Sequence, residues 1–88
     1  MLTESTNDAE ATALAALAAT LTDERRARRF LDLTGLSPNE LRARAGERSL
    51  LAATIAFLES HEPDLIAVAE EIGVKPAHLV AAGVALKA

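Results

Sequence analysis

The sequence predicts an all-α fold, a compact bundle of about five to six short helices. Half of the 88 residues are apolar, and Ala and Leu, which favour helices, dominate among them. No stretch alternates apolar and polar residues as a half-buried strand would. Gly, Pro and capping residues divide the chain into segments of helical length.

Length and composition indicate what stabilises the fold and where in the cell the protein is expected. The chain contains no Cys, so its stability must come from the core rather than from disulfides. Residues 1–7 are expected to be a frayed N-terminus, and residues 8–88 a single helical domain. The N-terminus has no basic flank, and the longest uncharged run, residues 11–22, is too short to span a bilayer. We therefore expect a cytoplasmic protein with no membrane segment.

The first predicted helix begins at a cap formed by Asn7 or Asp8 and extends to about Leu21. Its leucines, Leu14, Leu17 and Leu21, form a narrow stripe, and the rest of its surface is mostly Ala and Thr. A helix so poor in charge is expected either to be covered by its neighbours or to form part of an interface.

The second and third helices are predicted from their caps. The second begins at a Thr22 cap and ends at Gly35, because Gly adopts the left-handed conformation at a helix end with little cost. Ser37 can cap the third helix, Pro38 suits its first position, and Glu40 can accept a hydrogen bond from the Ser37 amide. This capping box predicts a short third helix.

A fourth helix, from about Glu47 to His61, is the candidate for the central core helix because its centre is uncharged and its apolar face is wide. Pro63 separates it from a fifth helix that ends at Gly73. A sixth helix then begins at Pro76. The apolar face of the fourth helix comprises Leu50, Leu51, Thr54, Ile55, Phe57 and Leu58.

One local pattern, helix–Gly-x-x-Pro–helix, occurs twice. Gly35 and Pro38 in the first copy correspond to Gly73 and Pro76 in the second. The second copy resembles a helix-turn-helix, whose second helix would enter a DNA major groove. Its expected outward residues are mostly unable to read base edges, so we interpret this copy as a packing corner. Those outward residues are Lys75, Pro76, Ala77, Val80 and Ala81.

The first copy carries the candidate binding residues, because every arginine of the chain lies in or beside it. Several arginines on one side of the molecule could hold phosphates or an acidic protein partner. The alternative is a solvated helix face on which interspersed acids, such as Asp32 one turn beyond Arg28, pair with the arginines. The candidate residues are Arg25, Arg28, Arg29, Asn39, Arg42, Arg44 and Arg48.

The sequence offers little for catalysis or for cofactor binding. His61 and His78 are the only histidines, and their spacing matches no metal-ligand motif. Glu70 and Glu71 are adjacent on a helix, so their side chains diverge by about 100°. There is no Cys nucleophile and no glycine-rich phosphate loop. We expect a protein that is not an enzyme and has no metal and no cofactor.

Three segments, LTGL at 33–36, LRARA at 41–45 and HEP at 61–63, resemble a small bacterial family catalogued as domain of unknown function 3572. The resemblance covers residues 9–86 and implies a compact all-helical protein, but it supplies no activity, cofactor or catalytic residue. The function we expect is a small non-enzymatic protein-interaction module, whose partner is another protein or a second copy bound through the first helix. The alternative is a helix-turn-helix-like DNA-binding regulator that uses the basic region from Arg25 to Arg48; the net charge of −4 argues mildly against it.

Overall fold

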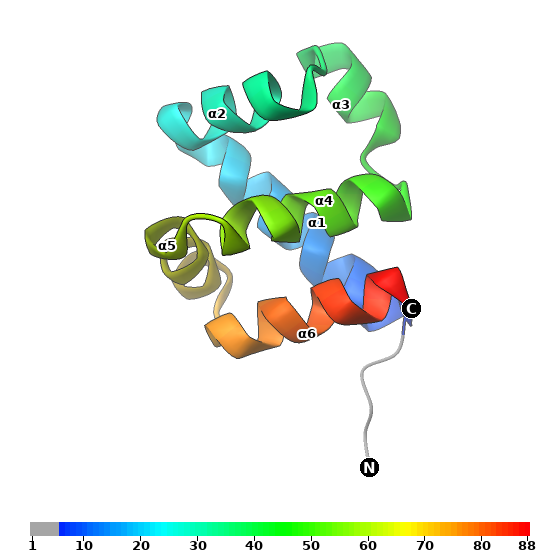
Figure 1. Ribbon diagram of the computed structural model, residues 1–88, viewed down its shortest axis with the longest axis vertical. Helices are drawn as coiled ribbons and strands as arrows, with labels where there is room; N and C mark the ends of the chain where they lie inside the picture. The colour runs from blue at the N-terminus through cyan, green and yellow to red at the C-terminus, as the bar shows by residue number, and fades with distance from the viewer. Residues whose placement is uncertain (1–5) are drawn as a thin grey trace.

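The computed structural model describes residues 6–88, which form six α-helices and no strand (Figure 1). This confirms the all-α bundle that the sequence predicts. The expected frayed segment lies outside the described residues, except for Thr6 and Asn7, which open the first helix. The helices are α1 (Thr6–Thr22), α2 (Glu24–Thr34), α3 (Pro38–Arg44), α4 (Arg48–Glu59), α5 (Glu62–Ile72) and α6 (Pro76–Lys87).

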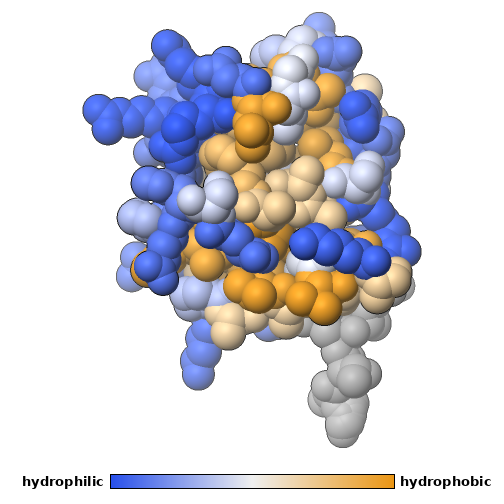
Figure 2. Space-filling model, in the orientation of Figure 1, coloured by the Kyte–Doolittle hydropathy of each residue, from blue (hydrophilic) through white to orange (hydrophobic). Residues whose placement is uncertain are grey.

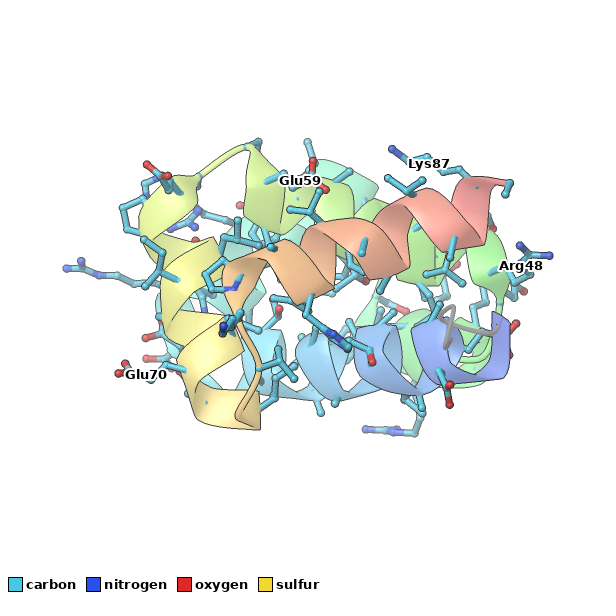
Figure 3. All side chains as sticks on the ribbon, turned by 90° about the horizontal axis from the view of Figure 1, so that it is seen from below. Arg48, Glu59, Glu70 and Lys87 are labelled. Atoms are coloured by element: carbon cyan, nitrogen blue, oxygen red, sulfur yellow. The ribbon has the colours of Figure 1, made fainter. Side chains whose placement is uncertain are left out.

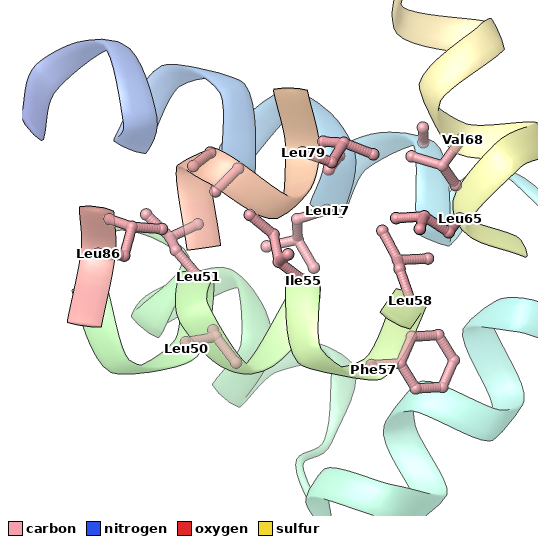
Figure 4. Packing of buried hydrophobic residues seen from close by; sticks show 14 of the residues in the cluster. Leu17, Leu50, Leu51, Ile55, Phe57, Leu58, Leu65, Val68, Leu79 and Leu86 are labelled. Carbon is pink, nitrogen blue, oxygen red and sulfur yellow. The ribbon is translucent and has the colours of Figure 1, made fainter. Parts of the chain in front are cut away.

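Helix α4 contributes more large core side chains than any other helix, as its uncharged apolar face predicts. In Figure 1 it crosses in front of α1, with the α2–α3 corner above it and α6 below. Figure 4 shows its Leu51, Ile55 and Leu58 side chains directed towards residues of α6, α1 and α5. The closely packed pairs join α1 to α2, α4, α5 and α6, join α4 to α5 and α6, and join α5 to α6; α3 belongs to none of them.

Helix α1 packs on the core mainly through small side chains. Ala13 and Ala16 are fully buried, whereas Leu14 and Leu21 are 47% and 37% exposed. Small residues allow neighbouring helices to approach closely, because the interaxial distance depends on the side chains at the contact. The predicted leucine stripe is therefore divided: Leu17 lies in the core, and the other two leucines face outward.

Both Gly-x-x-Pro corners form as predicted. Gly35 and Gly73 end their helices in the left-handed conformation, with φ angles of 72° and 79°. Pro38 and Pro76 occupy the first turn of the helices that follow, and the predicted capping box is present at the first corner. The corners differ in their packing, because α5 and α6 both pack on α1 and α4, whereas α3 stands at one end of the bundle.

The start of α2 differs from the prediction by one residue, because Asp23 and not Thr22 is its N-cap. The Asp23 carboxylate accepts a hydrogen bond from the Arg26 amide at 3.0 Å. This bond is the main reason that the pKa of the Asp23 carboxyl is lowered. Thr22 still belongs to α1, where its hydroxyl donates to the Ala19 carbonyl at 2.7 Å. Because the Thr22 hydroxyl bonds within α1, Thr22 does not cap α2.

Candidate binding groove and the basic region

An apolar groove of about 390 Å³ lies between α1, α2 and α3. Four of its residues come from α1 at the spacing i, i+3, i+4 and i+7, which places them on one side of that helix. The groove is lined by Leu14, Leu17, Ala18 and Leu21 of α1, by Leu31 of α2, and by Pro38, Leu41, Arg42 and Ala45 at α3. One charged side chain, Arg42, is among them.

The position of α3 explains why this groove is open. Gly35 and the capping box fix where α2 ends and where α3 begins. The short α3 reaches the core through Leu41, which is 4% exposed, but packs closely along no other helix. The outward side of α1 therefore remains in contact with solvent at Leu14 and Leu21.

A second hollow, of about 360 Å³, lies between the α2–α3 corner and α4. Figure 2 shows this face of the molecule, on which apolar surface extends from the corner over α4 towards α6 between hydrophilic flanks. Leu33, which is 70% exposed, contributes to the hollow. Its lining is more polar than that of the groove, so the groove is the stronger candidate site. The hollow is lined by Leu33, Thr34, Leu36, Arg44, Ser49, Leu50 and Ala53.

Several of the candidate arginines contact other residues of the protein. Arg29 forms an ion pair with Asp64 of α5, and its guanidinium carbon lies 5.6 Å from the centre of the Phe57 ring. Arg44 pairs with Glu47, with 2.8 Å between Nε and Oε1. Arg29 thus connects α2 to α5, and Arg44 connects α3 to the start of α4.

Arg48 contacts the last turn of α6. Its guanidinium donates to the carbonyl of Leu86 at 3.0 Å and to that of Ala85 at 3.4 Å. Carbonyl groups at a helix C-terminus lack partners within the helix, and a cation there also interacts favourably with the negative end of the helix dipole. Figure 3 shows Arg48 beside this end of α6, with Glu70 at the opposite end of the molecule.

The remaining candidate residues are exposed. Within residues 6–88, Arg25 and Arg28 take part in no ion pair, and the expected pair between Arg28 and Asp32 is not formed. Arg42 donates a hydrogen bond to Asn39 Oδ1 at 3.1 Å. The candidate set therefore does not form one cluster, and only Arg42 lines the groove.

One arginine outside the candidate set is buried. Arg26 is 6% exposed and donates to the Ala19 carbonyl at 2.8 Å and to the Glu71 carboxylate at 3.1 and 3.3 Å. Its Nε has no hydrogen-bond partner. Arg26 thus links α1, α2 and α5. No local sequence pattern indicates this role, because Glu71 lies 45 residues further along the chain.

The α5–α6 corner presents a mainly apolar face to solvent. Lys75, Ala77 and Val80 are exposed, as the sequence predicts. Leu79 and Ala82 are fully buried, and α6 packs against α1, α4 and α5. The face that a helix-turn-helix would offer to DNA therefore carries one cationic residue, Lys75, at its N-cap.

Both histidines are exposed. His61 is the N-cap residue of α5, and the Nε2 atom of His78 lies 3.4 Å from the Thr12 hydroxyl oxygen. Among residues 6–88, no three His, Cys, Asp or Glu side chains are grouped so that they could hold a metal ion. None of the helices in this part of the chain combines the length and the apolarity needed to cross a bilayer.

The family model described as Protein of unknown function (DUF3572) matches residues 6–88. The chain belongs to this family. The resemblance carried by the LTGL, LRARA and HEP segments is thereby confirmed. No curated protein and no solved structure matches the chain. The DUF3572 match covers all six helices, so the groove lies entirely within the part of the chain that defines the family.

Proposed function

We propose that this DUF3572 protein is a non-enzymatic cytoplasmic protein-interaction module that binds its partner in the groove between α1, α2 and α3. The observation that supports this is the exposure of Leu14 and Leu21 on the uncharged stretch of α1 from Ala11 to Thr22, where they line a groove that is almost wholly apolar. Covering such a surface is favourable because apolar area is removed from water.

Partner capture with matched variants tests this proposal. Leu14→Ser removes a leucine of the groove, and Leu33→Ser makes the same change in the second hollow. Cross-linking and quantitative mass spectrometry in the native host should recover a partner with the wild-type protein and with Leu33→Ser, and lose it with Leu14→Ser. Equal recovery with all three proteins contradicts binding in the groove.

A second copy of the chain is one form that the partner could take. Analytical ultracentrifugation over a range of concentrations distinguishes it from a different protein. Self-association through α1 predicts a dimer that Leu14→Ser dissociates and Leu33→Ser does not. A monomer at every concentration removes self-association from the proposal.

DNA binding through the basic region is the alternative function. It is supported by Arg25 and Arg28, which are exposed and form no ion pair within residues 6–88. A gel-shift titration at low and moderate salt decides between the two functions. DNA binding predicts complexes at low salt and a smaller salt dependence for Arg28→Ala and Arg42→Ala, because each loses a phosphate contact. No complex at low salt ends this alternative.

A further inference from the structure

We infer that the occupant of the groove is an amphipathic helix of a partner protein that places a carboxylate against Arg42. This inference rests on the proposed interaction function and specifies its partner. The arrangement of the apolar side chains and the charge of the groove support it separately.

The apolar residues of the groove match the face of a short helix. Leu14 and Leu21 are seven residues apart on α1, which corresponds to about 10 Å along the helix axis. Leu31 and Leu41 face this row from α2 and α3. A groove lined along about two turns of one helix accepts apolar side chains spaced i, i+3 or i+4, and i+7 along a partner helix.

The charge of the groove indicates that the partner residue beside Arg42 is acidic. Arg42 is its one charged lining residue, and no acidic residue lines it. The hydrogen bond that Arg42 makes is to Asn39, which is neutral, and α1 carries no charge from Ala11 to Thr22. A partner carboxylate can therefore form a charge-assisted, bidentate pair with this guanidinium.

The same charge disfavours a second copy of the chain. In a two-fold symmetric dimer the same surface of each subunit faces the other. Each groove would then meet another groove that also contributes an Arg42 and no acid. Neither groove then offers the other a carboxylate for its Arg42, so a separate acidic helix is the better complement.

A display library of helical peptides tests the inference. The peptides carry apolar residues at i, i+3, i+4 and i+7, with the flanking positions randomised. Selection against the wild-type protein should enrich Asp or Glu beside the apolar face. Leu14→Ser should weaken the selected peptides at least about tenfold, because Leu14 is the most exposed leucine of the groove and loses its apolar contact with the peptide.

Charge reversal provides the decisive comparison. Selection against Arg42→Glu should enrich Lys or Arg at the same flanking position. Arg44→Glu is the matched control, because Arg44 is on the same helix but lines the second hollow, and it should keep the preference for Asp or Glu. Ala18→Gln, which obstructs the groove at an exposed position, should abolish binding, whereas Ala15→Gln, outside the groove on the same helix, should not.

The other outcomes overturn the inference in distinguishable ways. Two results overturn the acidic helix and leave the proposed function standing. In the first, the selected peptides require Leu14 but show no preference for Asp or Glu. In the second, selection against Arg42→Glu enriches the same flanking residues as selection against the wild type. A wild-type dimer that Leu14→Ser dissociates replaces the acidic helix with a second copy. If the library yields no peptide whose binding depends on Leu14, the acidic helix is overturned. If partner capture from the native host is also unchanged by Leu14→Ser, the proposed function is overturned as well.

Discussion

Gly83 of α6 lies so close to Ile55 of α4 that a Cβ atom at position 83 would come within 2.9 Å of Ile55 Cγ2. Both residues are buried, and Ile55 is completely inaccessible to solvent. Gly83 is not among the glycines with positive φ, so the requirement at this position is for space. This contact allows the close packing of α4 against α6 in the centre of the core.

We predict that Gly83→Ala lowers the free energy of unfolding by about 1 kcal/mol, because overpacking costs about 1–3 kcal/mol and outweighs the gain of about 1 kcal/mol in helix propensity. Urea denaturation measures the change. The loss should be smaller in an Ile55→Leu background, which has no branch at Cβ, and should persist with Ile55→Val, which keeps it. A stabilising effect of Gly83→Ala in the wild type contradicts the close contact.

The burial of Arg26 predicts unequal effects for the two partners of its ion pair. Glu71→Ala should cost about 2 kcal/mol, because it leaves a buried guanidinium with one acceptor. Arg26→Met should cost less than about 1 kcal/mol, because it removes the unpartnered Nε, and the Ala19 carbonyl keeps the hydrogen bond from Thr22. Denaturant titration of both variants checks the order, and a larger loss for Arg26→Met contradicts it.

The packing of α1 predicts which of its leucines stabilise the fold. Leu17 is 3% exposed and Leu14 is 47% exposed. Leu17→Ala should therefore cost about 2–5 kcal/mol, and Leu14→Ala about 1 kcal/mol or less. Thermal or chemical unfolding of the two variants compares the same substitution on one helix. Equal losses would mean that the outward side of α1 is covered.

Local features of this fold were predictable because the contacts that produce them span a few residues. Gly35 ends α2 with an amide that bonds to the Leu31 carbonyl four residues earlier, and Ser37 and Glu40, three residues apart, cap α3, so the sequence contains each whole interaction. The apolar face of α4 is similarly evident from its spacing. The sequence does not reveal the Asp23 cap, because the Thr22 hydroxyl can either accept from an amide of α2 or donate to a carbonyl of α1. In the structure it donates to the Ala19 carbonyl, and Asp23 caps α2.

The contacts between helices were much less predictable. In α1 the many alanines leave the apolar pattern weak, so its neighbours decide which side is buried. The sequence marked the charge-poor α1 as a possible interface. It could not place Leu31 and Leu41 opposite Leu14, because that arrangement depends on the angle at which the α2–α3 corner meets the bundle.

The capping box predicts a pH dependence of stability. The Ser37 amide, and secondly the Ser37 hydroxyl, lower the pKa of the Glu40 carboxyl from its ordinary value of 4.5. Because the folded pKa is below the unfolded one, unfolding takes up a proton in acid. This contribution to stability is complete above about pH 4.5 and is lost as the pH falls through the lowered folded pKa.

Glu40→Gln isolates this effect, because glutamine does not titrate. The difference in free energy of unfolding between the wild type and Glu40→Gln should shrink as the pH falls from 5 to about 2.5, whereas the lowered pKa of Asp23 contributes equally to both proteins. Ser37→Ala should cost about 1 kcal/mol at neutral pH, as for other N-cap removals. A difference that grows in acid contradicts the hydrogen bonding of Glu40.

The binding groove is tested most directly by nuclear magnetic resonance, in which an acidic amphipathic peptide from the selection is titrated into the labelled protein. We predict the largest amide shift changes at residues 14–21 of α1, at Leu31, and at residues 41–45 in and beside α3. The exposed apolar residues Val80 and Val84 of α6 serve as the internal comparison. Changes centred on α6, with α1 and α3 unaffected, would contradict binding in the groove.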